Sequence, residues 1–153
     1  MQLRFVRTER RSRLTCVRAD GSFCTAELGP GLPYHDLAHF VVERAYGLRR
    51  GFFGHVACGY SLEDLSKKEV ILSLDAQSSV AEVRARALGS RATGACTLEQ
   101  FPALAQEELT RMNLTPPGEL TMEQARCMLE EYRGLLDRYD ALPLGQTLEL
   151  SFN

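Results

Sequence analysis

The chain's three histidines, His35, His39 and His55, all fall within one short stretch. Histidine is the side chain best suited to proton transfer near neutral pH, and its neutral imidazole is the commonest metal ligand in proteins. His35 and His39 are four residues apart, which places them on the same side of a helix, one turn from each other. This spacing predicts that both imidazoles can reach a single metal ion.

Two histidines are too few for a zinc site, which takes three or four protein ligands. Asp36 and Glu43 lie on or beside the same helical line. His55 and Cys58 follow in the next segment and share a face if that segment is helical. We therefore predict a site for a divalent metal such as zinc, with hydrolysis by a metal-activated water as its chemistry. The candidate ligands are His35, His39, Asp36, Glu43, His55 and Cys58.

Two other interpretations of this helix face remain open. It could be a solvated or hydrogen-bonded surface, where each charged i,i+4 pair contributes roughly 0.2–0.5 kcal/mol, or a metal-free acid–base site. At 100° per residue the face is roughly opposite the apolar face of the same helix, so water or another element must cover it. In the alternative function class, the chain is a non-catalytic interaction module without metal, in which the sheet or the Phe52/Phe53 region meets a partner or a second copy.

A single α+β domain spanning 1–153 is expected to position these residues. Residues 3–8, 13–18 and 23–28 alternate like strands and form a meander, and residues 147–152 alternate as a closing strand. The closing strand needs a partner, and the meander is the only predicted sheet. We predict a four-stranded, mainly antiparallel sheet covered on one face by about five helices.

Helical periodicity runs from Tyr34 to Tyr46, with Gly47 as its C-cap. A short buried helix in 51–59, a brief one ending at Leu65 and another over 80–88 should follow, while 69–74 is ambiguous between strand and helix and favours helix. Capping boxes at 97–100 and 121–124 each start a further helix, the last ending near Tyr139. Residues 91–95 and 115–119 are predicted surface loops.

Gly51-Phe52-Phe53-Gly54 lacks the strand-then-helix setting of a nucleotide-binding glycine loop. Its glycines predict instead that two backbones approach closely beside packed phenylalanines.

Five scattered cysteines without a CxxC pair predict free thiols. Cys16 and Cys24 flank the turn at Asp20-Gly21. A two-residue loop would put them on opposite faces of the sheet, whereas a three-residue loop with Gly21 in the left-handed conformation would set them directly opposite each other. Both registers remain open.

Composition is that of an ordinary globular protein, with 44% hydrophobic and 25% charged residues and a net charge of −2. No run approaches the ~20 apolar residues of a spanning helix, and the first residues lack a secretory signal, so we expect a cytoplasmic protein that does not bind membranes. Arginines crowd the N-terminal segment, but no interleaved aromatic residues support base stacking, so nucleic-acid binding is not expected. These arginines are Arg4, Arg7, Arg10, Arg11, Arg13 and Arg18.

The run His35-Asp36-Leu37-Ala38-His39 resembles the His-Asp core of the HD phosphohydrolases and the HDxxH zinc motif of a ubiquinone-biosynthesis family. The first family needs an earlier histidine, and none precedes His35; the second places a glutamate where this chain has Gly51. Neither ligand set therefore transfers residue by residue.

A longer resemblance joins His35-Asp36-Leu37, His39-Phe40, Val42-Glu43, Gly47-Leu48 and Gly51-Phe52-Phe53-Gly54. It covers about the first seventy residues, preceded by Arg18-Ala19-Asp20-Gly21 and followed by a Leu62/Leu65 segment, and is similar to a group of bacterial hypothetical proteins. The resemblance implies a shared bacterial domain and carries no assigned activity.

Overall fold

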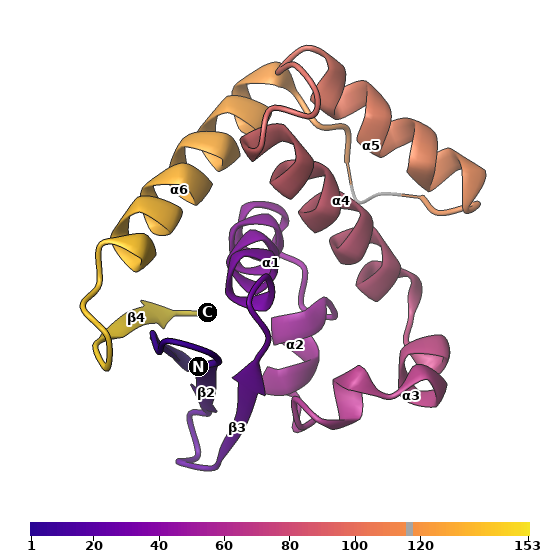
Figure 1. The fold of residues 1–153 in the computed structure, drawn as a ribbon. Helices are drawn as coiled ribbons and strands as arrows, with labels where there is room; N and C mark the ends of the chain where they lie inside the picture. The colour runs from indigo at the N-terminus through magenta and orange to yellow at the C-terminus, as the bar shows by residue number, and fades with distance from the viewer. Residues whose placement is uncertain (116–117) are drawn as a thin grey trace.

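The computed structural model describes residues 1–115 and 118–153. Its four strands are β1 (Gln2–Val6), β2 (Ser12–Val17), β3 (Phe23–Leu28) and β4 (Thr147–Ser151). They form one antiparallel sheet in the order β3-β2-β1-β4 (Figure 1). The predicted meander and closing strand are confirmed, and β1 receives β4 on the side that β2 leaves free.

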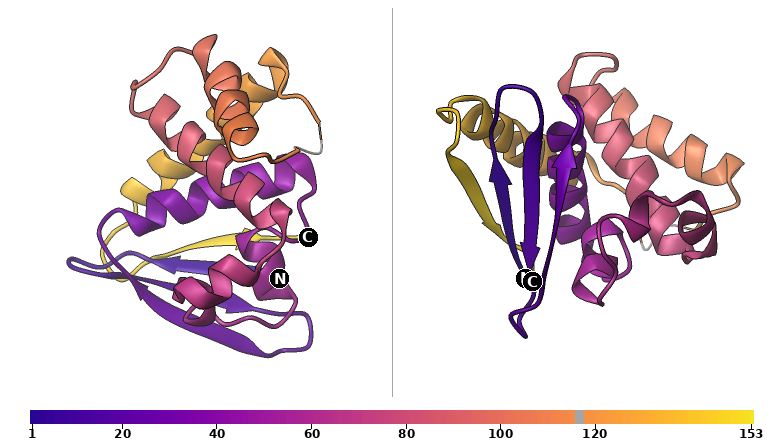
Figure 2. Two further views of the ribbon diagram at one scale, coloured as in Figure 1. Left: turned by 90° about the vertical axis from the view of Figure 1, so that its right-hand side faces the viewer. Right: turned by 60° about the horizontal axis from the view of Figure 1, so that its bottom comes forward.

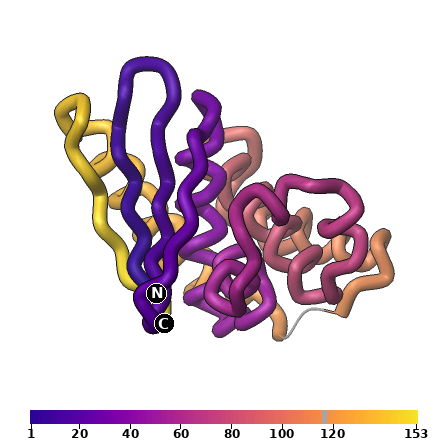
Figure 3. The backbone as a smooth tube through the Cα atoms, turned by 90° about the horizontal axis from the view of Figure 1, so that it is seen from below, coloured from indigo at the N-terminus to yellow at the C-terminus, as the bar shows by residue number. Residues whose placement is uncertain are grey.

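Alternation along the strands gives the sheet one apolar face. Leu3 and Phe5 of β1, Leu14 of β2 and Leu148 of β4 are buried, whereas Arg4 between Leu3 and Phe5 is exposed. The helices lie on the apolar side of the sheet, as Figure 2 shows. The chain ends meet at one end of the sheet (Figure 3), where the amino group of Met1 donates to the Phe152 carbonyl at 2.6 Å.

The loop between β2 and β3 decides the cysteine register. Gly21 is in the left-handed conformation with φ +84°, and the Arg18 amide donates to the Ser22 carbonyl at 2.8 Å. Cys16 is therefore directly opposite Cys24, which confirms the three-residue alternative. All five thiols are free.

Among the described residues, six α-helices and one short 3-10 helix cover the sheet and each other. Their bounds are α1 (Leu32–Tyr46), α2 (Phe52–Ala57), the 3-10 helix η1 (Asp64–Ser66), α3 (Lys68–Ser73), α4 (Ala76–Ala92), α5 (Gln100–Arg111) and α6 (Met122–Asp140). The ambiguous segment 69–74 is thus helical up to Ser73. Of the predicted loop 115–119, residues 116 and 117 lie outside the described residues. No described helix has the length and hydrophobicity needed to cross a membrane.

Helix α1 lies between the sheet and the outer helices, and it contacts both α4 and α6. Pro33 lies in its first turn, and Gly47 ends it in the left-handed conformation with φ +59°. Its residues are buried without a break from Asp36 to Glu43. Another element does cover the face that carries the histidines, and that element is α4.

The glycines of the Gly51–Gly54 segment let α2 pack close to α1. A methyl group at Gly54 would overlap the backbone of Arg49, and one at Gly51 would overlap the Glu43 carboxylate. Phe53 is fully buried and contacts Phe52 and Phe152. The predicted close approach is confirmed, and it delivers the start of α2 to Glu43.

Candidate metal centre

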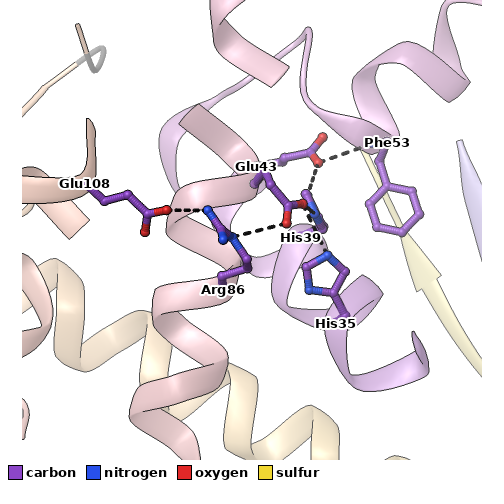
Figure 4. Close-up of polar contacts among 7 residues, drawn as sticks. His35, His39, Glu43, Phe53, Arg86 and Glu108 are labelled. Atoms are coloured by element: carbon purple, nitrogen blue, oxygen red, sulfur yellow. Dashed lines mark hydrogen bonds and ion pairs between the residues drawn. The ribbon is translucent and has the colours of Figure 1, made fainter. Parts of the chain in front are cut away.

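Three side chains from two helices converge beside the sheet: His35 and His39 from α1 and Glu82 from α4. Each offers one ligand atom, and these atoms all lie within 4.8 Å of one another. Glu82 Oε2 is 3.3 Å from His35 Nε2 and 3.0 Å from His39 Nε2. Figure 4 shows the two imidazoles on successive turns of α1, directed toward the same point.

Helix α4 can present Glu82 because its apolar residues pack against α1. Asp75 caps the helix by accepting from the Gln77 amide at 2.8 Å, and Ala81, Ala85 and Leu88 are fully buried on the packed side. Glu82 is at the edge of that packed side, with 44% of its side chain exposed.

Arg86, one turn after Glu82, holds the outer oxygen of the carboxylate, with 3.3 Å between Arg86 Nε and Glu82 Oε1. Arg86 also contacts Glu108 of α5 (Figure 4). The guanidinium therefore fixes one carboxylate oxygen and leaves Oε2 directed at the histidines.

Glu43 lies behind His39 and is almost completely buried. Its Oε1 is 3.2 Å from His39 Nδ1 and accepts from the Phe53 amide at 3.3 Å, while Oε2 accepts from the Gly54 amide at 3.1 Å. When His39 donates its Nδ1 proton to Glu43, the lone pair on Nε2 faces Glu82. A carboxylate in this position sets the tautomer and orientation of a metal-binding histidine.

The carboxylates of the cluster favour the positively charged form of His39. Burial disfavours the charged imidazole, but hydrogen bonds to Glu43 and Glu82 outweigh it and raise the pKa of His39 to about 9. Hydrogen bonds from His35 and His39 hold the pKa of Glu82 well below its usual range. In the metal-free protein, a proton on His39 thus supplies positive charge between Glu43 and Glu82.

Asp36, the residue after His35, is buried beside the cluster. Its Oδ2 is buried and has no hydrogen-bond partner among the described residues. Burial raises the pKa of Asp36 to about 7, although the neighbouring His39 and His35 partly oppose the shift. The carboxyl group is outside the set of ligand atoms that lie within 4.8 Å of one another, and its Oδ2 forms no hydrogen bond with the described residues.

A cleft of about 880 Å³ opens onto the cluster. His35, Asp36, His39 and Glu82 line it together, and β3, α2, η1, α3 and α4 supply its other walls. A ligand that enters this cleft can therefore reach the converging atoms directly.

Four of the six predicted ligands are not part of the converging group: Asp36 lies beside it, Glu43 lies behind His39, and His55 and Cys58 lie in and after α2. His55 is buried in α2, where its ring contacts Tyr60 edge-to-face and its Nε2 has no partner among the described residues. Cys58 is exposed. Within the part of the chain that the structure describes, the converging group consists of His35, His39 and Glu82.

Glu82 is the ligand candidate that sequence reasoning missed. It is 43 positions from His39 and has no histidine or cysteine near it in the chain. The one local signal is its i,i+4 spacing to Arg86, which is common on exposed helix faces and indicates no metal.

Comparisons with protein-family models, with curated proteins and with solved structures found no match to this chain.

Proposed function

We propose that this protein binds a divalent transition-metal ion, zinc in the first instance, through His35, His39 and Glu82, and that it is a metal-dependent hydrolase. The observation that carries the proposal is the convergence of three ligand atoms with a buried carboxylate, Glu43, positioned behind one of them.

The donor set fits the ion. Two imidazole nitrogens and one carboxylate oxygen are the protein ligands of many catalytic zinc sites, which keep a further position for water or substrate. With metal–ligand bonds of about 2.0–2.2 Å, tetrahedral ligands lie roughly 3.3–3.5 Å apart. The distances from Glu82 Oε2 to His35 Nε2 and His39 Nε2, 3.3 and 3.0 Å, need only a small adjustment.

Each remaining polar group has a defined part in this function. A bound zinc ion would lower the pKa of its water and supply the nucleophile. Glu43 holds the His39 ring, and Arg86 holds the outer oxygen of Glu82. Asp36 lines the cleft without a structural partner on its Oδ2, so it is the group available to take a proton from an attacking water and deliver it to a leaving group.

The decisive experiment is a zinc titration of the purified protein against a chelator that reports free metal, together with elemental analysis. We expect one zinc ion per chain, and at least a tenfold loss of affinity in His39→Ala and in Glu82→Gln. Cys58→Ser should bind as tightly as the wild type because Cys58 is exposed and outside the cluster.

Retained stoichiometric zinc in both His39→Ala and Glu82→Gln would overturn the ligand assignment. If zinc is bound, hydrolysis of activated esters should depend on it and should be lost in Asp36→Asn, which keeps the three ligands. If the zinc-loaded wild type hydrolyses these esters no faster than Asp36→Asn does, the proposal of a hydrolase is refuted and the proposal of a metal site still stands.

A further inference from the structure

The cleft above the proposed metal centre is mostly apolar, and its walls come from six different elements. Its apolar lining includes the buried or half-buried Leu28, Phe52, Leu65, Leu74 and Val83 and the exposed Leu32. Several of these belong to the hydrophobic core or pack against it, so the cleft is an extension of the core that reaches the surface. Besides the polar cluster, the lining includes polar side chains such as Thr25, Glu27, Glu63 and Ser66.

The size of the cleft matches a small organic molecule. Ligand pockets for drug-sized molecules have volumes of roughly 300–1,000 Å³, and this cleft has about 880 Å³. The short helix α3, which leaves Ile71 half exposed at the cleft, forms part of its outer wall. A chain of several methylene groups can therefore lie along the apolar walls while its polar end reaches His35 and His39.

The charges that line the cleft disfavour an anionic ligand. Glu27, Asp36, Glu63 and Glu82 contribute carboxyl groups, and the cationic side chains among the described lining residues of the metal-free protein are Arg86 and the protonated His39, which is paired with Glu43 and Glu82. Arg86 is already paired with Glu82 and Glu108. Glu27 and Glu63 pair with cations that do not line the cleft, so its inner surface has no free positive side chain to receive a phosphate or carboxylate.

We propose that the substrate is a neutral, amphipathic acyl ester whose hydrocarbon chain occupies the apolar cleft and whose carbonyl lies at the metal centre. This inference rests on the proposed function for the chemical step and on the cleft alone for binding. In the step, the oxygen of water bonds to the acyl carbon, the bond from that carbon to the alcohol oxygen breaks, and a proton reaches the leaving alcohol through Asp36. The products are a carboxylic acid and an alcohol.

The test uses N-methylalkanamides of four to eight acyl carbons, which present the same neutral carbonyl but resist hydrolysis. Their binding to the zinc-loaded protein is measured by calorimetry. Each methylene transferred from water to the cleft should strengthen binding by up to about fourfold. Ile71→Asp places a charge in the apolar wall and should remove most of this dependence on chain length.

Leu72→Asp is the matched control. Leu72 is the next residue of α3, is more exposed than Ile71 and does not line the cleft, so this variant should keep the wild-type dependence. In the zinc-free protein, where no metal ion attracts the phosphate group, octyl phosphate should bind at least threefold more weakly than the amide of equal chain length. Tighter binding of the phosphate, a flat dependence on chain length, or equal effects of the two substitutions would overturn the inference.

The outcomes separate the two proposals. A Glu82→Gln protein that has lost zinc should still discriminate amides by chain length, because the apolar walls remain. If the wild-type protein binds no zinc but still shows an Ile71-dependent chain-length effect, the proposed metal centre is refuted and the cleft assignment stands. If the protein binds zinc but shows no chain-length effect, the cleft assignment is refuted and the proposed metal centre stands.

Discussion

Glu43 connects two features of the molecule that are separate in the sequence. Its two oxygens accept from the Phe53 and Gly54 amides at the start of α2, where a helix leaves N–H groups without internal partners. The same carboxylate accepts from His39 Nδ1. The position of α2 and the orientation of the imidazole therefore depend on one buried side chain.

Glu43→Gln tests this dependence. The amide keeps the size of the side chain but presents an NH₂ group where the carboxylate accepts, so one of its three N–H partners loses its acceptor. We expect a 10- to 100-fold loss of zinc affinity and a fall of about 1–3 kcal/mol in the free energy of unfolding. Competition titration and urea denaturation measure the two effects.

Glu131→Gln is the control, because Glu131 is a surface partner of Arg44, with 2.7 Å between Arg44 Nη1 and Glu131 Oε1. Glu131→Gln should change neither the zinc affinity nor the free energy of unfolding appreciably. Unaltered zinc affinity in Glu43→Gln would mean that Glu43 does not orient the metal ligand.

For single residues, the sequence predicts the contacts that depend on local spacing along a helix. His35 and His39 converge as their i,i+4 spacing requires. The structure directs Glu43, one turn farther along, at His39 Nδ1 and at α2. Nothing local reveals that α2 returns to α1, or that Glu82 approaches from a helix 43 positions away.

The contact between α1 and α4 combines apolar packing with a buried polar pair. Ala81 and Ala85 of α4 and Val42 of α1 are buried, and between these helices His39 bridges Glu43 and Glu82. Periodicity and capping residues predicted the presence of most helices, although α4 (Ala76–Ala92) extends beyond the predicted 80–88 and into the predicted loop 91–95. The partner of the histidine face could not be predicted, because the apolar stripe of a helix indicates only one of its packed sides and α1 is packed on several.

The raised pKa of His39 predicts how the stability of the metal-free protein varies with pH. The pKa is about 9 in the folded protein and about 6.5 in an unfolded chain. Folding therefore favours the protonated imidazole, and its stabilising contribution is fully present below about pH 6.5 and is lost as the pH rises through about 9. Its magnitude is on the order of 3 kcal/mol.

Urea denaturation in the presence of a chelator, at intervals from pH 6 to pH 10, measures this contribution when wild type and His39→Gln are compared. The stability difference between them should shrink as the pH rises. Glu82→Gln should show a smaller pH dependence than the wild type, since one acceptor of the imidazolium is gone. A difference between wild type and His39→Gln that grows toward pH 10 would contradict the assignment.

In the whole molecule, the proposed metal centre lies where the layer next to the sheet meets the outer helices. Helix α1 packs on the sheet, and α4 contacts α1 from the other side. The addition of β4 to the meander was predictable because a closing strand must find an edge of the single sheet, whereas the choice of the β1 edge over the β3 edge was not predicted. The cleft was not predictable, since its walls combine β3 with helices as far along the chain as α4, and no local pattern specifies how these elements meet.

Because the proposed ligands come from α1 and α4, a bound ion would stabilise the folded molecule as a whole. Zinc at 100 times its dissociation constant should add about 2.7 kcal/mol to the free energy of unfolding. For a chain of this length, that corresponds to a rise of roughly 5–10 °C in Tm. Thermal denaturation followed by circular dichroism, with and without zinc, measures the shift.

Glu82→Gln should show little or none of this rise in Tm, whereas Cys58→Ser should show all of it. An equal rise in Glu82→Gln and the wild type would place the stabilising ion elsewhere on the protein and would separate metal binding from the contact between α1 and α4.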